Sequence, residues 1–270
     1  MTNYNIGICI EKNIVEPFIF ERAIANIQSL SKKYNLKIYT QETIAELNNC
    51  VHSCPSQKMI DDYKKGEIDC FIRGINDDLK FQSKFKETFG YKELLRLVFV
   101  QDNYNREFGI GPASAGEGEG VEKRLEFAIK VSNFLSYMKI NPKIAVMSRC
   151  RKESVNHSEA NEESWENSDY IVSELTKLGI TASNIGIEIE NAVGKFNYVL
   201  VENGLIGNQI YRTLMFLGNG RILGIPAFGI NDLKYQYLYE NNSRNEENYE
   251  PHINASIYYM ENMEKRKQIT

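Results

Sequence analysis

The stretch FNYVLVENGLIGNQIYRTLMFLGNGRILGI, residues 196–225, places a polar loop between a buried strand and the start of a helix. Its apolar run at 198–201 is typical of a parallel strand that is covered on both faces. The polar and small residues that follow this strand and open the predicted helix are Asn203, Gly204, Gly207, Asn208 and Arg212. Ligands of open α/β sheets bind outside the carboxyl ends of the strands, and helix starts favour anions. We therefore expect an anionic ligand at this turn.

Short apolar runs alternate with amphipathic stretches along most of the chain. The runs predict strands at 5–10, 36–39, 70–72, 97–100, 144–147, 185–189, 198–201 and 222–225. The stretches predict helices at 18–30, 60–65, 121–138 and 162–178. This βαβ order predicts an α/β fold with mainly parallel sheets flanked by helices.

Length and composition limit the function classes. With 270 residues, 42% of them hydrophobic, and a formal net charge of −4, the chain can bury one large or two modest cores. No apolar run approaches the roughly 20 residues that cross a bilayer, and the first residues lack the pattern of a signal peptide. We expect a cytoplasmic protein that binds neither membrane nor nucleic acid, because its basic residues are dispersed.

The five cysteines favour reduced thiols over a disulfide framework. Cys50, His52 and Cys54 are residue types that bind zinc, but no second pair of ligands follows at a usable spacing, so we interpret them as an ordinary loop and expect no metal. Cys9 and Cys70 lie inside apolar runs and are predicted to lie in the core.

The glycine-rich segment GIGPASAGEGEG, residues 109–120, resembles a loop that binds phosphate. It lacks the lysine of a P-loop, and Glu117 and Glu119 would repel a phosphate. We therefore interpret the segment as a flexible connection or a crossing between lobes.

Polar pairs follow three of the predicted strands. They are Arg73-Gly74, Ser148-Arg149 and Asn203-Gly204, and Ser243-Arg244 makes a fourth if the chain returns to the same edge. A parallel sheet places such strand ends along one edge. Because the planar fork of arginine binds both oxygens of a phosphate or carboxylate, the set predicts a site for a small anionic ligand.

Several of these segments resemble a known family. The stretch NGLIGNQIYRTLMFLGNGRILGIPAFGI resembles the G-x-x-G-N turn, helix and glycine-rich strand of methanogenesis marker protein 4, the MtxX-type methyltransferase-related family. Further matches in the same order are IRGI, GEGEGVEKRLEFA, KIAVMSRCR and ENNSRNEENYE. That family is similar to phosphate acetyl- and butyryltransferases.

The resemblance implies an isocitrate/isopropylmalate dehydrogenase-like fold with two α/β lobes and a ligand cleft between them. The first lobe would comprise residues 1–94 and 232–270, and the second residues 95–231. A C-terminal helix around Ile253, Ile257 and Met260 would pack on the first lobe. The resemblance further implies an archaeal protein that forms a homodimer.

In phosphate acyltransferases a Ser-Arg pair before that helix binds and helps to transfer the acyl group, and an acidic residue follows. The resemblance assigns these catalytic roles to Ser243, Arg244 and Glu250. Two positions depart from the family. Arg149-Cys150 replaces a Gly-Gly pair, and Glu202-Asn203 replaces Pro-Asp, which removes a carboxylate that can act as a base.

Three functions remain open. The first is an MtxX-like protein of methanogenesis, with a methyltransferase partner subunit. The second is a phosphate acyltransferase, for which coenzyme A and phosphate are the candidate cofactor and ligand. The third is a binding or regulatory subunit without catalysis, and the two departures favour it. A dehydrogenase is disfavoured because the chain lacks the G-x-G-x-x-G loop, and no glycine-rich S-adenosylmethionine fingerprint follows the first strand.

Overall fold

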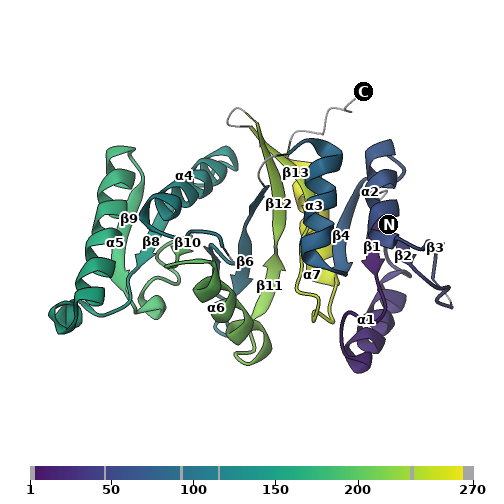
Figure 1. Cartoon of the computed structure of the whole chain (residues 1–270), viewed down its shortest axis with the longest axis horizontal. Coiled ribbons are helices and arrows are strands. Elements are labelled where there is room, and N and C mark those ends of the chain that lie inside the picture. The colour runs from purple at the N-terminus through teal and green to yellow at the C-terminus, as the bar shows by residue number, and fades with distance from the viewer. Residues whose placement is uncertain (1–3, 46, 92–93, 115, 232–233, 264–270) are drawn as a thin grey trace. The chain divides into compact units, whose positions relative to one another are not determined.

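The chain divides into two compact α/β units (Figure 1). The computed structural model describes residues 4–45, 47–91, 94–114, 116–231 and 234–263. Unit 1 comprises Met1–Arg96 and Gly224–Thr270, and unit 2 comprises Leu97–Leu223. Each unit has one mainly parallel sheet with helices packed on it, which confirms the predicted fold class.

The sheet of unit 1 has seven strands in the order β3-β2-β1-β4-β13-β12-β5. Their bounds are Asn49–Val51 (β3), Asn35–Thr40 (β2), Asn5–Ile10 (β1), Cys70–Ile75 (β4), Lys234–Glu240 (β13), Pro226–Asn231 (β12) and Leu94–Arg96 (β5). The first five in this order run parallel, and β12 is antiparallel to both of its neighbours. The chain moves outward from β1 through β2 to β3 and then returns to β4 on the other side of β1. The topological switch point of this sheet therefore lies between β1 and β4.

Two helices cover each face of this sheet. The helices α2 (Pro55–Lys65) and α3 (Asp78–Phe89) pack on one face over an aromatic core, in which Phe71 and Tyr239 stack with ring centroids 5.2 Å apart. The helices α1 (Pro17–Leu30) and α7 (Glu250–Asn262) lie on the other face, where the Tyr249 N–H donates to Asn26 Oδ1 at 2.9 Å. The predicted C-terminal helix thus packs on β13 and β4 of unit 1.

The sheet of unit 2 has six strands in the order β11-β6-β7-β10-β8-β9. Their bounds are Arg221–Gly224 (β11), Val98–Gln101 (β6), Glu107–Gly111 (β7), Tyr198–Leu200 (β10), Lys143–Met147 (β8) and Thr181–Gly186 (β9). The helices are α4 (Val121–Tyr137), α5 (Glu159–Lys177) and α6 (Gly204–Phe216), with 3-10 turns at Lys152–His157 and Ile189–Asn191. The strands β7, β10, β8 and β9 run parallel, and β6 is antiparallel to β7.

Two predictions were wrong in this unit. The strand expected at 185–189 lies at Thr181–Gly186, because this polar, partly exposed segment is the edge strand β9 and has no apolar run to mark it. The segment 109–120 is not only a connection, because its first residues belong to the central strand β7. A Cβ atom at Gly109 would overlap the ring of Tyr198 on the neighbouring strand, so glycine is needed there for packing.

None of the five cysteines is paired in a disulfide within the described residues. Cys9 and Cys70 are buried in the core, as predicted. Cys50 lies in β3, and His52 accepts a hydrogen bond at Nδ1 from the Cys54 N–H at 3.0 Å.

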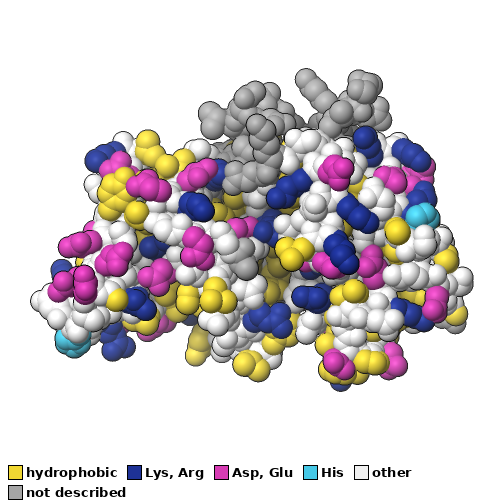
Figure 2. Space-filling model, in the orientation of Figure 1, with side chains coloured by type: hydrophobic (Ala, Val, Ile, Leu, Met, Phe, Trp, Pro, Cys, Tyr) yellow, Lys and Arg dark blue, Asp and Glu magenta, His cyan; other side chains and the backbone are white. Residues whose placement is uncertain are grey.

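Within the described ranges, no three His, Cys, Asp or Glu side chains gather to hold a metal ion, and no helix is long and apolar enough to span a bilayer. Figure 2 shows basic and acidic side chains interspersed on the visible face.

Candidate functional site

The candidate site of unit 1 lies at the carboxyl ends of β4 and β13. These strands pair in parallel through Ile72 and Glu240, so the polar segment after Glu240 reaches the edge where Arg73 lies. The chain thus meets the condition under which Ser243-Arg244 joins Arg73-Gly74 at one edge. Ser148 and Asn203, in contrast, follow strands of the other sheet, so the expectation of one shared sheet edge was wrong.

Arg73 is buried and fixes the segment that follows β13. Its Nε donates to Asn241 Oδ1 at 2.6 Å, its Nη1 donates to Asn76 Oδ1 at 2.9 Å, and its Nη2 donates to the Asn242 carbonyl. Burial lowers the pKa of this guanidinium, and the charge of Asp78, 3.5 Å from Nε, opposes the shift. A fork with several donors in fixed geometry suits this positioning role.

Gly74 completes the contact with the same segment. Its N–H donates to Asn242 Oδ1 at 2.8 Å, so Asn242 is bound through both its main chain and its side chain. Gly74 has a φ of 78°, and a Cβ atom there would overlap the Cys9 carbonyl oxygen. The site therefore requires glycine at this position.

Ser243 and Arg244 come directly after this fixed residue. The Ser243 carbonyl accepts from Asn242 Nδ2 at 2.9 Å and from the Glu246 N–H at 3.0 Å, and its hydroxyl accepts from the Asn245 N–H at 3.3 Å. The Arg244 side chain is exposed, and among the residues that the structure describes it makes no hydrogen bond or ion pair. The turn thus presents a guanidinium beside an ordered hydroxyl.

The carboxylate of Glu250 contacts two residues that follow α1. Its Oε1 lies 2.7 Å from Lys33 Nζ and accepts from the Tyr34 hydroxyl at 3.3 Å. The hydrogen bond and charge of Lys33 lower the pKa of this carboxyl, so it is ionised at neutral pH. Its role as a catalytic acid or base stays a prediction.

The candidate residues of unit 2 after β8 are held by side-chain contacts. The buried Ser148 hydroxyl donates to Asn184 Oδ1 at 2.7 Å. The Arg149 N–H donates to Ser164 Oγ at 3.0 Å, and that hydroxyl donates to Glu202 at 3.0 Å, next to Asn203. The ends of β8 and β10 therefore lie together, and the side chain of Arg149 is exposed beside them.

The G-x-x-G-N turn packs the start of α6 against residues 112–114. Cβ atoms at Gly204 and Gly207 would overlap the carbonyl oxygens of Ser114 and Pro112, respectively. Asn208 Nδ2 donates to the Ala113 carbonyl at 3.0 Å. The structure thus gives these three residues a packing role, and their role toward an anion stays a prediction.

Asn203 and Arg212 lie on either side of that packed turn. Asn203 Oδ1 accepts from the Ile206 N–H at 3.1 Å and caps α6. Arg212 lies further along the helix, exposed, with its guanidinium carbon 5.1 Å from the centroid of the Phe216 ring.

Sequence reasoning missed Arg124, a buried arginine of α4. Its Nε donates to the Val201 carbonyl at 3.1 Å and its Nη2 to the Met147 carbonyl at 2.8 Å, so it joins the ends of β10 and β8. Burial lowers its pKa to about 10, and the charge of Glu202 opposes this. The signal in the sequence is its position one turn before Ala128, on the buried stripe of the helix.

Comparison with known proteins supports the resemblance. No protein-family model matches the chain. Two proteins named "Putative methyltransferase mtx subunit X" are each 26% identical to it, over 190 residues in Methanosarcina mazei (70% of this chain, 66% of the relative) and over 178 residues in Methanosarcina acetivorans (66% and 62%). An "Uncharacterized methyltransferase" of Methanocaldococcus jannaschii is 26% identical over 207 residues (73% and 80%). The chain spans just under two thirds of the length of the first two relatives, and it is similar to MtxX-type proteins.

Solved structures support the fold. A branched-chain phosphotransacylase from Enterococcus faecalis superposes with a TM-score of 0.67 at 11% identity, covering 93% of this chain and 98% of that one. A phosphotransacetylase from Streptococcus pyogenes has a TM-score of 0.54 at 12% identity, covering 95% and 94%. The chain therefore has the fold of phosphate acyltransferases.

Proposed function

We propose that the protein is an MtxX-like, methyltransferase-associated subunit that binds a small anion at the carboxyl ends of β4 and β13. The observation that carries this proposal is the exposed guanidinium of Arg244, presented by a segment that Arg73 fixes through Asn242. A guanidinium binds both oxygens of a carboxylate or phosphate. A segment that is already ordered loses little conformational freedom when the ligand binds. The expectation that the ligand lies between the lobes stays a prediction.

The names of the relatives support a role alongside other subunits, because the Methanosarcina proteins are called subunits of a methyltransferase. We infer that this chain works with a methyltransferase partner, which supplies the methyl donor. Homodimer formation stays a prediction from the resemblance.

Thermal unfolding tests the anion site. Inorganic phosphate, acetyl phosphate or coenzyme A should raise the melting temperature of the intact protein, because a ligand that binds only the native state stabilises it. Arg244→Ala should abolish this rise. Arg221→Ala is the matched control, since it removes an exposed arginine of β11 in unit 2. A rise that persists in Arg244→Ala, or no rise with any of the three ligands, would contradict the proposal.

Acyl transfer between phosphate and coenzyme A is the second candidate function. The observation that favours it is the ordered Ser243 directly before Arg244, on a phosphotransacylase-like fold. In this reaction the thiol sulfur attacks the acyl carbon, a C–S bond forms as the C–O bond to phosphate breaks, and the thiol proton passes to a base. Arg244 would offset the phosphate charge, and Ser243 would donate to the oxygen that becomes negative. Glu250 is the candidate base, and it would have to act despite its contact with Lys33.

An activity assay separates the two functions. If acyl transfer is the function, acetyl phosphate and coenzyme A should give acetyl-coenzyme A, and Ser243→Ala and Arg244→Ala should each lower kcat/KM by about a hundredfold or more. If the unaltered protein binds an anion but forms no thioester, the acyltransferase assignment is excluded and the binding subunit is supported. Absence of both turnover and anion binding would contradict both assignments.

A further inference from the structure

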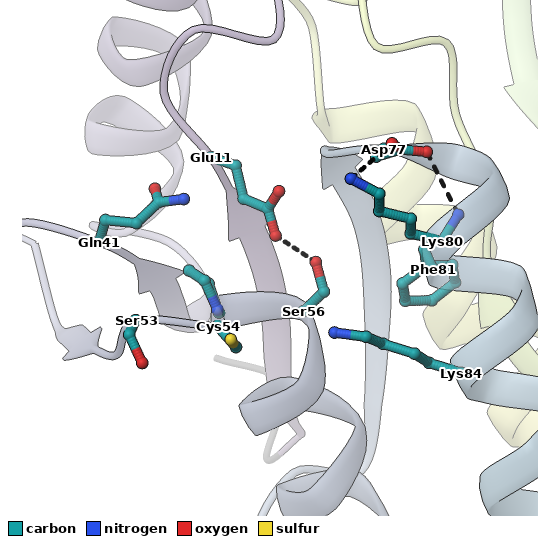
Figure 3. Close-up of a pocket in the computed structure, with 10 residues that line it drawn as sticks. Glu11, Gln41, Ser53, Cys54, Ser56, Asp77, Lys80, Phe81 and Lys84 are labelled. Atoms are coloured by element: carbon teal, nitrogen blue, oxygen red, sulfur yellow. Dashed lines mark hydrogen bonds and ion pairs between the residues drawn. The ribbon is translucent and has the colours of Figure 1, made fainter.

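A cavity of about 160 Å³ lies in unit 1 between the starts of α2 and α3 (Figure 3). Glu11, directly after β1, and Asp77, after β4, both line it. The cavity therefore lies at the topological switch point of the sheet, where open α/β sheets bind ligands. It is distinct from the Arg244 turn, whose residues do not line it.

The carboxylate of Glu11 is held in place at one side of this cavity. The Glu11 N–H donates to the Ile75 carbonyl at 2.8 Å, which fixes its main chain across the switch point. Its Oε1 accepts from the Ser56 hydroxyl and lies 3.8 Å from Cys9 Sγ. Its Oε2 has no hydrogen-bond partner among the described residues, so this oxygen remains able to accept from a ligand.

Two lysines of α3 line the same cavity. Nζ of Lys80 lies 3.6 Å from Asp77 Oδ2 and forms an ion pair with it. Lys84, one turn later, lines the cavity and makes no ion pair or hydrogen bond with the part of the chain that the structure describes. Figure 3 shows its ammonium pointing toward Ser56 from α3, while the Glu11 carboxylate points there from the end of β1. In Figure 2, dark-blue side chains lie over the face of α3.

The charges around the cavity define what fits it. Its lining has two carboxylates, of Glu11 and Asp77, and two ammonium groups, of Lys80 and Lys84, so its formal charge is balanced. A simple anion would be attracted by Lys84 but repelled by Glu11. A simple cation would be attracted by Glu11 but repelled by Lys84. A ligand with a positive and a negative group satisfies both, because each charge then has an opposite partner.

The size of the cavity and the start of α2 agree with such a ligand. The volume is below the range of about 300–1,000 Å³ that suits drug-sized molecules, so the ligand is small. The helix α2 has Pro55 in its first turn and no side-chain cap at Cys54, and both residues line the cavity. The positive end of this helix therefore favours the negative group of the ligand on the side of α2 and Lys84.

We propose that this cavity binds a small amino acid as a zwitterion, with its ammonium group on Glu11 and its carboxylate beside Lys84 and the start of α2. The site is additional to the anion site at Arg244 and does not depend on it.

Calorimetric titration of the purified full chain tests this site. Glycine, alanine and serine are the probes, and acetate and ethylammonium each present one half of the zwitterion. At least one of the three amino acids should bind, and each half should bind more than about tenfold more weakly, because it loses one charge-assisted contact. No heat with any of the three amino acids, or acetate affinity equal to that of the amino acids, would overturn the proposal.

Two variants of the cavity and three control variants make the test specific. Glu11→Gln and Lys84→Gln keep the side-chain size, and each should weaken amino-acid binding by about tenfold or more. Glu87→Gln and Lys86→Gln are matched controls on α3 outside the cavity, and they should leave the affinity unchanged. Amino-acid binding that survives both Glu11→Gln and Lys84→Gln would refute the assignment. Arg244→Ala should retain amino-acid binding, so loss of the anion site and loss of this site are distinguishable.

Discussion

Nδ1 of His252 lies 2.9 Å from Oε1 of Glu240, and both side chains are fully buried in unit 1. The other ring nitrogen, Nε2, lies 3.6 Å from Oε2 of Glu246. Burial lowers the pKa of the imidazole, but its contacts with Glu240 and Glu246 outweigh burial and raise the pKa to about 9. At neutral pH α7 is therefore joined to β13 by a buried imidazolium between two acidic side chains.

The stability of the protein should fall as the pH rises from neutral to alkaline. The folded pKa of His252, about 9, lies above its unfolded value of about 6.5, so its contribution is complete below the lower value and is lost as the pH passes the higher one. We expect the free energy of unfolding to fall by on the order of 2 kcal/mol over this window, measured by urea denaturation. His252→Gln should remove most of this fall, and His52→Gln, in the exposed segment after β3, should keep it. Equal falls in both variants would rule out His252 as the cause.

Gly74→Ala should destabilise the protein much more than Gly90→Ala. Both glycines have a positive φ, 78° and 70°, so alanine costs about 1–2 kcal/mol at either position from the backbone alone. At Gly74 the new Cβ atom also overlaps the Cys9 carbonyl oxygen, whereas nothing lies within 4 Å at Gly90. We expect a loss of more than about 3 kcal/mol for Gly74→Ala in urea denaturation. Similar losses of unfolding free energy at the two positions would show that the overlap with the Cys9 carbonyl does not destabilise the protein.

Arg73→Lys should weaken anion binding although it keeps the charge. A single ammonium cannot reproduce the guanidinium fork that bonds Asn241, Asn76 and the Asn242 carbonyl, so the segment before Arg244 becomes less ordered. We expect the melting-temperature rise with phosphate to shrink, together with a stability loss of about 2 kcal/mol. The matched control is Arg22→Lys, which changes an exposed ion pair with Glu247 and should cost less than about 1 kcal/mol. A melting-temperature rise with phosphate as large in Arg73→Lys as in the unaltered protein would argue against a positioning role of Arg73.

Asp62 should carry part of the acid sensitivity. Its buried carboxylate accepts from Lys37 at 2.9 Å, from Tyr39 at 2.8 Å and from Lys58. Burial raises its pKa, but these three donors outweigh burial and lower the pKa to about 2. Its contribution of about 2 kcal/mol is therefore present above about pH 4 and is lost as the pH falls to about 2.

Urea denaturation between about pH 4 and about pH 2 tests the contribution of Asp62, with one conservative variant and one control. Asp62→Asn should flatten the acid limb of the stability curve. Asp61→Asn, on a neighbouring carboxylate that accepts only from Gln57 among the described residues, should leave it unchanged. An unchanged acid limb in Asp62→Asn would contradict the assignment.

The elements with strong local signals could be predicted from the sequence. The apolar run before Asn203 marks β10, and Asn203 itself marks the start of α6 because its side chain caps the helix. The helix α3 has a cap at Asp77 but a weak apolar pattern, since only Phe81 and Phe85 of its residues are buried. Its place is decided by packing on Phe71 and Tyr239, which are far apart in the sequence.

The candidate site could be predicted only in part for the same reason. Arg73 and Ser243 stand out as polar residues after apolar or family-like segments, but their meeting depends on the position of β13 beside β4. Glu11 and Lys84 carry no local signal at all, because a charged residue after a strand or on a helix is normally a solvated one. Only the packed chain shows that both line one cavity.

The position of β13 between β4 and β12 also sets an order of events during synthesis. Residues 97–223 are contiguous, so unit 2 has all of its strands as soon as they leave the ribosome. The first segment of unit 1 leaves earlier but must keep the edge of β4 unpaired, and β5 without its partner β12, until residues from Gly224 onward arrive. Long-range strand pairing of this kind folds slowly and exposes strand edges to other chains. A nascent chain that is stalled after unit 2 should therefore need a chaperone at its oldest, not its newest, residues.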